Sequence, residues 1–169
     1  MVIWITGLSG AGKTSIARTL VARLRGMGET VVLLDGDQIR KIIDDPHTGH
    51  DHEARLRNAR RISRMATFLE SQGVKVVVAT MSLFHEIHQW NRTNMQQYLE
   101  VLVTADLETL HKRDGKGLYT AVVQGKEANL PGVDMDYQLP ESPHLILENN
   151  RPTDDFSTFV QQIMAQAEF

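Results

Sequence analysis

The 169-residue sequence predicts an α/β fold in which helices flank a five-stranded parallel sheet. Short runs rich in β-branched residues alternate with longer amphipathic segments, which is the pattern of strands joined by helical crossovers. The runs are apolar almost throughout, as expected for strands that are buried on both faces. The expected strands are Val2–Thr6, Val31–Asp35, Val74–Thr80, Glu100–Thr104 and Leu145–Glu148.

Helices are predicted where apolar residues recur every three or four positions. Two long helices are expected over Thr14–Arg25 and Arg55–Gln72. A last helix is expected to begin after Thr153, whose hydroxyl is a suitable N-cap. The stripe of this helix, expected to pack on the core, is Phe156, Phe159, Val160, Ile163 and Met164.

The composition indicates one domain over residues 1–169, because 41% hydrophobic and 23% charged residues suit a single core. No repeat or linker divides the chain. Two stretches rich in helix-breaking residues, Asp44–Glu53 and Lys116–Pro143, are expected to form lid loops. A helix is expected after the third strand, and Trp90 and Tyr98 are assigned to it, as packing or subunit-contact residues rather than base readers.

The charge balance argues against broad binding to nucleic acid or to an anionic membrane, because 18 basic and 21 acidic residues leave a net charge of -3. The absence of Cys excludes disulfides and thiolate metal sites and favours a cytoplasmic protein. No apolar run approaches the roughly 18 residues of a membrane-spanning helix. The first residues read as a strand rather than an export signal, so neither export nor membrane insertion is expected.

The strongest motif is Gly7-Leu-Ser-Gly-Ala-Gly-Lys-Thr14, which fits the phosphate-binding loop pattern between an apolar strand and an amphipathic helix. Its glycines allow backbone N–H groups to surround phosphate oxygens at the positive end of the helix. Lys13 is expected to reach the β- and γ-phosphates, and the Thr14 hydroxyl to bind Mg²⁺. The residues expected to hold ATP here are Gly7, Ser9, Gly10, Ala11, Gly12, Lys13, Thr14 and Ser15.

A small-molecule kinase is the class that best suits this loop in so short a chain. The sequence has no Asn-Lys dipeptide, so the usual guanine-reading motif of GTPases is missing. Two lid loops would keep water away from the transferred phosphoryl group. A regulatory or nucleic-acid-binding P-loop NTPase that uses the Arg-rich helix remains the alternative, and it predicts strongly salt-dependent binding to RNA or DNA.

Two carboxylates, Asp35 and Asp37, follow the second strand and are expected at the carboxyl edge of the sheet, where such folds bind ligands. One can support the water shell of a metal ion, and the other can orient or deprotonate an acceptor hydroxyl. The chain then concentrates arginines that are expected mostly on a solvated helix face, with one or two of them facing the cleft. They are Arg40, Arg55, Arg57, Arg60, Arg61 and Arg64.

Five segments together resemble the adenylylsulfate kinase family over essentially the full chain. They are GLSGAGKT (7–14), LDGDQIR (34–40), RLRNARRI (55–62), RDGKGLY (113–119) and Gly132-Val-Asp134. The resemblance implies a P-loop kinase fold that uses ATP and Mg²⁺. It also implies transfer of the γ-phosphoryl group to the ribose 3′-hydroxyl of a small nucleotide acceptor.

By the same resemblance, Asp37 activates the acceptor and Asp35 supports Mg²⁺ together with Thr14. Arg113 packs on the base of ATP. The expected catalytic residues are Lys13, Asp35, Asp37 and Ser82. The residues expected to bind the acceptor are Asp37, Arg40, His50, Arg55, Asn58, Ser82, Lys116 and Leu130. A homodimer is left open.

The acceptor side departs from the family, which places two Phe against the adenine of adenylylsulfate. Here Thr48-Gly-His50-Asp and Leu130 stand in those stretches. Because one base-stacking contact contributes about 1–3 kcal/mol, the base preference is expected to differ. The chain also resembles relatives that phosphorylate cytidine 5′-diphosphoramidate in bacterial capsule modification. Cytidine 5′-diphosphoramidate and adenylylsulfate therefore both remain candidate acceptors. The spacing of His47, His50 and His52 fits no zinc site.

Overall fold

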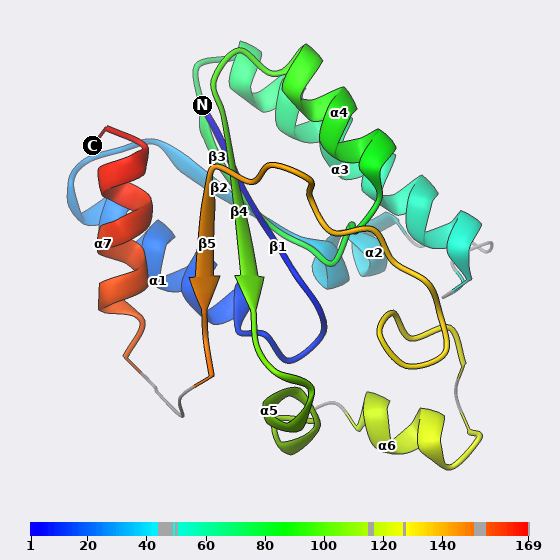
Figure 1. Ribbon diagram of the computed structural model, residues 1–169. Coiled ribbons are helices and arrows are strands. Elements are labelled where there is room, and N and C mark those ends of the chain that lie inside the picture. The colour runs from blue at the N-terminus through cyan, green and yellow to red at the C-terminus, as the bar shows by residue number, and fades with distance from the viewer. Residues whose placement is uncertain (44–48, 50, 115–116, 127, 151–154, 169) are drawn as a thin grey trace.

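The computed structural model describes residues 1–43, 49, 51–114, 117–126, 128–150 and 155–168. Its strands and helices alternate along the chain as the sequence predicts (Figure 1). The strands are β1 (Val2–Thr6), β2 (Val31–Asp35), β3 (Lys75–Ala79), β4 (Tyr98–Thr104) and β5 (Leu145–Glu148). The helices are α1 (Lys13–Gly26), α2 (Gly36–Ile43), α3 (His52–Ser71), α4 (His85–Asn94), α5 (Leu107–Lys112), α6 (Leu118–Val123) and α7 (Ser157–Gln166).

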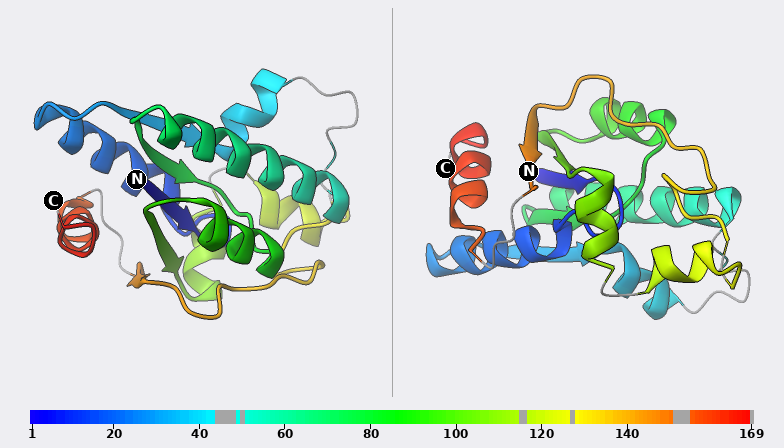
Figure 2. Two further views of the ribbon diagram at one scale, coloured as in Figure 1. Left: turned by 90° about the horizontal axis from the view of Figure 1, so that it is seen from above. Right: turned by 60° about the horizontal axis from the view of Figure 1, so that its bottom comes forward.

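All five strands are parallel, in the order β2-β3-β1-β4-β5, which confirms the predicted five-stranded sheet. Helices α1 and α7 cover one face, and α3 and α4 cover the other (Figure 2). The short helices α2, α5 and α6 lie near the carboxyl ends of the strands (Figure 1). Parallel strands require such crossovers, because their connections must return to the same end of the sheet.

The two cores follow from the two-residue period of a strand. In β1, Ile3 and Ile5 pack into the cluster beneath α1 and α7, whereas Val2 and Trp4 pack into the cluster beneath α3 and α4. All four side chains are buried. The central strand is therefore apolar on both faces, as its sequence predicts.

The final helix confirms its predicted stripe but not its predicted start. Val160 and Ile163 are buried, and Phe156, Phe159 and Met164 pack against the same cluster. The helix begins at Ser157 rather than directly after Thr153, which lies outside the described residues. The N-cap residue is Phe156, which offers no side-chain cap, and the Ser157 N–H donates to the Asp155 carboxylate at 2.8 Å.

Other boundaries also differ from the prediction, two of them in ways that matter for the site and the core. The loop expected over Asp44–Glu53 ends earlier, because Asp51 caps α3 by accepting the Ala54 N–H at 2.8 Å. Tyr98 is not on the helix after β3, as the sequence suggested, but is the first residue of β4. Its hydroxyl donates to the carboxylate of Glu100 at 2.7 Å on the same strand, and both polar groups also contact side chains of α4.

Candidate active site

A cavity of about 430 Å³ lies at the carboxyl ends of β1, β2 and β3. Both the phosphate-binding loop and the two aspartates contribute to its lining. The predicted site residues that line it are Ser9, Gly10, Gly12, Lys13, Thr14, Ser15, Asp35, Asp37, Arg40, Arg55, Asn58, Ser82, Arg113 and Leu130. Residues up to 128 positions apart in the sequence thus meet in one cavity, as open α/β folds require of a ligand site.

The phosphate-binding loop has a shape that glycine alone permits at two positions. Gly7 has φ +144°, and a Cβ there would lie 2.2 Å from the Val103 carbonyl oxygen. Gly12 has φ +98°, and a Cβ there would lie 2.6 Å from Nδ2 of Asn149. Helix α1 begins directly after Gly12 without a side-chain cap, which leaves its first N–H groups to bind an anion.

Lys13 lies against this loop, with its Nζ donating to the Leu8 carbonyl at 2.6 Å. The ammonium group therefore lies beside the glycine-rich turn, at the positive end of α1, where a phosphate chain would be neutralised. Gly7 and Ala11 belong to the same loop but are not among the residues that line the cavity. Their role is to shape the loop, since Ala11 is fully buried.

Thr14 and Asp35 form a pair across the cavity floor. The Thr14 hydroxyl donates to Oδ2 of Asp35 at 2.9 Å. The other carboxylate oxygen, Oδ1, accepts the backbone N–H of Asp37 at 3.0 Å and that of Gln38 at 3.2 Å. Asp35 is 6% exposed, so this buried carboxylate both supports the first turn of α2 and orients the hydroxyl of the phosphate-binding loop.

Asp37 lies among cations on the neighbouring wall. Its charge raises the pKa of Arg40 and Arg55, although burial, the larger effect, lowers both below the ordinary arginine value. Arg40 donates to the Gly49 carbonyl at 2.6 Å, and Arg55 donates to the Asn129 carbonyl at 2.8 Å. Asn58, which is buried, donates to the Gly36 carbonyl at 3.4 Å. Arg40 and Arg55 both line the cavity.

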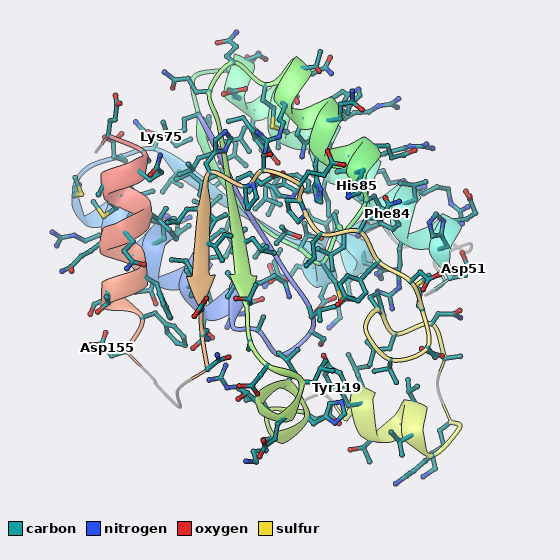
Figure 3. All side chains as sticks on the ribbon, viewed as in Figure 1. Asp51, Lys75, Phe84, His85, Tyr119 and Asp155 are labelled. Atoms are coloured by element: carbon teal, nitrogen blue, oxygen red, sulfur yellow. The ribbon has the colours of Figure 1, made fainter. Side chains whose placement is uncertain are left out.

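The lid contributes contacts that the sequence alone did not identify. Tyr119 of α6 is buried, and its hydroxyl donates to the Ser9 carbonyl at 2.9 Å (Figure 3). Burial, with Asp114 and Tyr137 nearby, raises the pKa of Tyr119 to about 12, so the phenol remains a donor. Its place in the RDGKGLY segment was the only signal in the sequence.

Asn149 was also missed, and it joins the end of β5 to the phosphate-binding loop. Its Nδ2 donates to the Ala11 carbonyl at 2.9 Å. Its own carbonyl accepts a hydrogen bond from Nη1 of Arg113 at 2.8 Å, which holds that side chain beside the cavity. The available signal in the sequence was an asparagine directly after a predicted strand, but no neighbouring residue indicated which group it would bind.

The remaining wall is formed by two segments, 79–84 and 128–137. Ser82 is buried, and its Oγ lies 2.9 Å from the Thr80 hydroxyl. Leu130, which is 3% exposed, also lines the cavity, as do the aromatic side chains of Phe84 and Tyr137. The ring of Phe84 also meets that of His52 edge-on, at 5.1 Å between centroids. Sequence reasoning did not select Phe84 or Tyr137 for the site.

Two predicted acceptor residues, His50 and Lys116, lie outside the described residues, as does His47. In the part of the chain that the structure describes, no three acidic or histidine side chains gather as a metal site. No helix within the described ranges has the length and apolar character to cross a bilayer.

The family model for adenylylsulphate kinase matches residues 1–148. The chain belongs to the adenylylsulphate kinase family. A cytidine diphosphoramidate kinase of Campylobacter jejuni is 37% identical over 149 residues, which cover 88% of this chain and 86% of that protein. A probable adenylyl-sulfate kinase of Pyrococcus abyssi is 41% identical over 153 residues, which cover 90% and 87%.

Among solved structures, the APS kinase CysC of Mycobacterium tuberculosis, in complex with AMPPNP and APS, aligns with a TM-score of 0.90 at 31% identity. That alignment covers 99% of this chain and 97% of the other. The predicted P-loop kinase fold is therefore confirmed, and this member of the family is an ATP-dependent kinase.

Proposed function

We propose that this kinase transfers the γ-phosphoryl group of ATP to the ribose 3′-hydroxyl of a nucleotide, either cytidine 5′-diphosphoramidate or adenylylsulfate. One observation carries the proposal: the phosphate-binding loop and the Asp37–Arg40–Arg55 group line the same cavity. The loop and Lys13 can bind a triphosphate, while the two arginines can bind the acidic 5′ group of an acceptor. Asp37 lies in the first turn of α2, and in chain order it stands between the phosphate-binding loop and the two arginines.

Asp37 is the proposed acceptor base. A carboxylate that accepts the proton of the attacking hydroxyl, together with fixed cations around the phosphoryl group, is sufficient for this type of transfer. No covalent enzyme intermediate is required. Asn58 and Ser82 are proposed to orient the acceptor, because both are buried polar groups that line the cavity.

The residues present suit Mg²⁺. Thr14 and Asp35 place hard oxygen ligands 2.9 Å apart at the end of the phosphate-binding loop, and Mg²⁺ prefers such oxygens, completing its octahedron with water and phosphate. When bound, the ion would neutralise charge on the phosphates. Thr14 would contribute its hydroxyl, and Asp35 would hold the surrounding water.

Leu130 favours the smaller cytidine acceptor. It stands where the family resemblance places a Phe against adenine, and in this protein it is a buried aliphatic residue on the cavity wall. Loss of one stacking face costs about 1–3 kcal/mol for a base that depends on it. Similarity to the P. abyssi and M. tuberculosis proteins favours adenylylsulfate, which therefore stays the second candidate.

The test is a steady-state assay with ATP, Mg²⁺ and each acceptor, in which ³¹P NMR locates the new phosphate. We expect phosphorylation at the 3′ position of one acceptor and none of its 3′-deoxy analogue. ATP consumption that is equal with the analogue, or unchanged when acceptor is omitted, would refute the proposal. Salt-sensitive binding to RNA or DNA, without transfer to either nucleotide, would instead support the regulatory alternative.

A further inference from the structure

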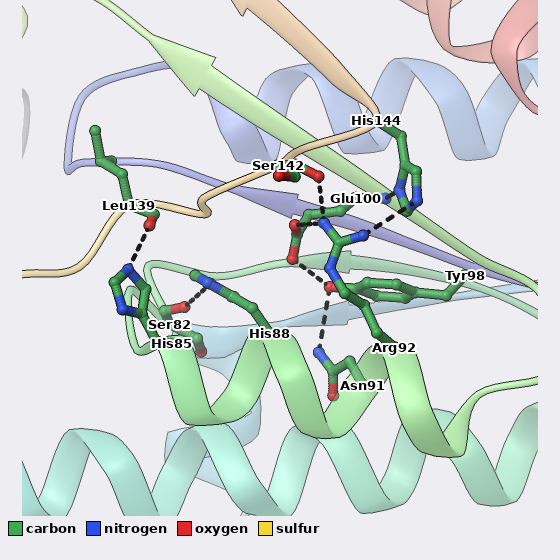
Figure 4. Close-up of polar contacts among 10 residues, drawn as sticks. All are labelled: Ser82, His85, His88, Asn91, Arg92, Tyr98, Glu100, Leu139, Ser142 and His144. Atoms are coloured by element: carbon green, nitrogen blue, oxygen red, sulfur yellow. Dashed lines mark hydrogen bonds and ion pairs between the residues drawn. The ribbon is translucent and has the colours of Figure 1, made fainter.

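Helix α4 carries a row of polar side chains that face the sheet and the segment before β5 (Figure 4). Arg92 donates to the buried carboxylate of Glu100 and to the Ser142 carbonyl, each at 2.5 Å. His144 accepts the Glu100 N–H at its Nδ1, at 2.8 Å. These contacts hold residues 142–144 against α4 and β4.

One member of this row, His88, contacts the wall itself. Its Nε2 lies 2.8 Å from the carbonyl oxygen of Ser82. A carbonyl only accepts, so Nε2 carries the proton in this contact. Burial lowers the pKa of His88, opposed by the nearby Glu100 carboxylate and the Ser82 carbonyl, whereas His85 and Arg92 lower it further. His88 is 4% exposed, and its Nδ1 has no hydrogen-bond partner among the described residues.

The wall is also held from its other side. The Leu83 carbonyl accepts the backbone N–H of Gln138 at 3.1 Å. The Gln138 side chain in turn accepts the His85 N–H at 2.9 Å, and the His85 ring nitrogen Nε2 lies 2.9 Å from the Leu139 carbonyl. The main chain of residues 82–83 is therefore hydrogen-bonded both to His88 on α4 and to Gln138.

We propose that His88 is a positioning residue for the acceptor: its Nε2–H holds the Ser82 carbonyl, so that Ser82, Leu83 and Phe84 present a fixed surface to the bound nucleotide. The inference rests on the proposed function, since the wall is assigned to the acceptor there. His88 does not line the cavity and touches no reacting group. Its effect is expected on acceptor binding and not on ATP, which is assigned to the separate loop of residues 7–14.

Two substitutions test the hydrogen bond. His88→Leu removes the donor while keeping an apolar side chain of similar bulk, and His88→Gln places an amide N–H near the position of Nε2. We expect His88→Leu to raise the KM for the acceptor about 3- to 10-fold, the factor typical of one lost hydrogen bond. The KM for ATP should stay within about 2-fold, and His88→Gln should restore most of the acceptor KM. An unchanged acceptor KM in His88→Leu, or equal rises for both substrates, overturns the proposal.

Asn91 provides a matched control. It lies three residues further along α4 and is fully buried, and its Nδ2 donates to the Tyr98 hydroxyl at 3.4 Å, in the same network but away from the wall. Asn91→Leu should lower the stability of the protein and leave the acceptor KM unchanged. If Asn91→Leu raises the acceptor KM as much as His88→Leu does, the effect is a general loss of packing around α4 and the proposal is wrong.

A second measurement does not depend on turnover. Amide hydrogen exchange of residues 82–84 in the substrate-free protein should be faster in His88→Leu than in Asn91→Leu. Equal exchange in the two variants overturns the positioning role. If the wild-type protein phosphorylates neither nucleotide, the proposed function fails, while the exchange comparison still decides whether His88 holds the wall.

Discussion

The buried carboxylate of Asp35 has two separable tasks, and a pair of substitutions should divide them. As a structural group, it accepts the N–H groups of Asp37 and Gln38 and the hydroxyl of Thr14. As a charge, it is proposed to support Mg²⁺. Asp35→Asn keeps a capping oxygen at nearly the same position, whereas Asp35→Ala removes every acceptor.

The magnitudes follow from these three contacts. Loss of a helix cap costs about 0.5–2 kcal/mol, and loss of a hydrogen bond to a charged group costs about 1.5–3 kcal/mol. Asp35→Ala should therefore lower the free energy of unfolding by about 2–5 kcal/mol. Asp35→Asn should lower it by no more than about 1.5 kcal/mol, the value of one neutral bond.

Activity should not follow stability. Both variants lose the negative charge, so both should reduce kcat by about 100- to 1,000-fold, which is typical when one preorganised electrostatic group is removed. Urea denaturation with an unchanged m-value gives the stability, and steady-state turnover with ATP and Mg²⁺ gives the activity. A stable Asp35→Asn protein with nearly wild-type kcat would refute the charge role.

Asp155 is the control for loss of a carboxylate hydrogen bond at the start of a helix. Its carboxylate accepts the Ser157 N–H at 2.8 Å, and it lies at the start of α7, well away from Tyr119 and Phe84 (Figure 3). Asp155→Ala should lower the stability without lowering kcat. A fall in kcat for this variant would mean that turnover simply reports helix stability, and the reasoning about Asp35 would fail with it.

Three further substitutions test the roles proposed for ATP binding and for the catalytic base, and a fourth tests recognition of the nucleobase of the acceptor. Lys13→Ala should reduce turnover at least about 100-fold, measured at saturating ATP. Asp37→Asn should reduce kcat by about 100- to 10,000-fold while calorimetry finds ATP affinity nearly unchanged, and a normal rate would remove its assignment as the base. Tyr119→Phe should raise the KM for ATP about 2- to 10-fold by deleting one hydrogen bond, with no change in the acceptor KM. Leu130→Phe should lower the KM for adenylylsulfate at least about 5-fold relative to that for the cytidine nucleotide, and an unaltered ratio would exclude this position from base selection.

The sequence predicted the donor side of the site because that side is local. Gly7 to Thr14 are contiguous, and their conformation follows from glycine geometry and from the helix that begins at Lys13. The proximity of Thr14 and Asp35 could also be predicted. Thr14 is the last residue of the phosphate-binding motif, and Asp35 is the last residue of a predicted strand. The order of elements then places both at one edge of the sheet.

The contacts that were missed join distant parts of the chain. Tyr119 reaches Ser9 across 110 positions, and Asn149 reaches Ala11 across 138. No periodic pattern marks such pairs, because a polar residue on an otherwise apolar segment has the same signature whatever its partner. Tyr98 was misplaced as well: it was assigned to the helix after β3, but it begins β4, where its hydroxyl donates to the buried carboxylate of Glu100.

The two halves of the cavity differ in how they are built, and this difference bears on the acceptor. In the proposed function, phosphate is bound by backbone N–H groups of one continuous loop, so substitutions that do not touch this loop or its contacts leave that geometry intact. The proposed acceptor wall combines side chains from separate segments, such as Arg55, Phe84, Leu130 and Tyr137. Each of these side chains can be replaced without altering the backbone conformation of the other segments. A kinase of this design can therefore change its nucleotide while keeping its chemistry.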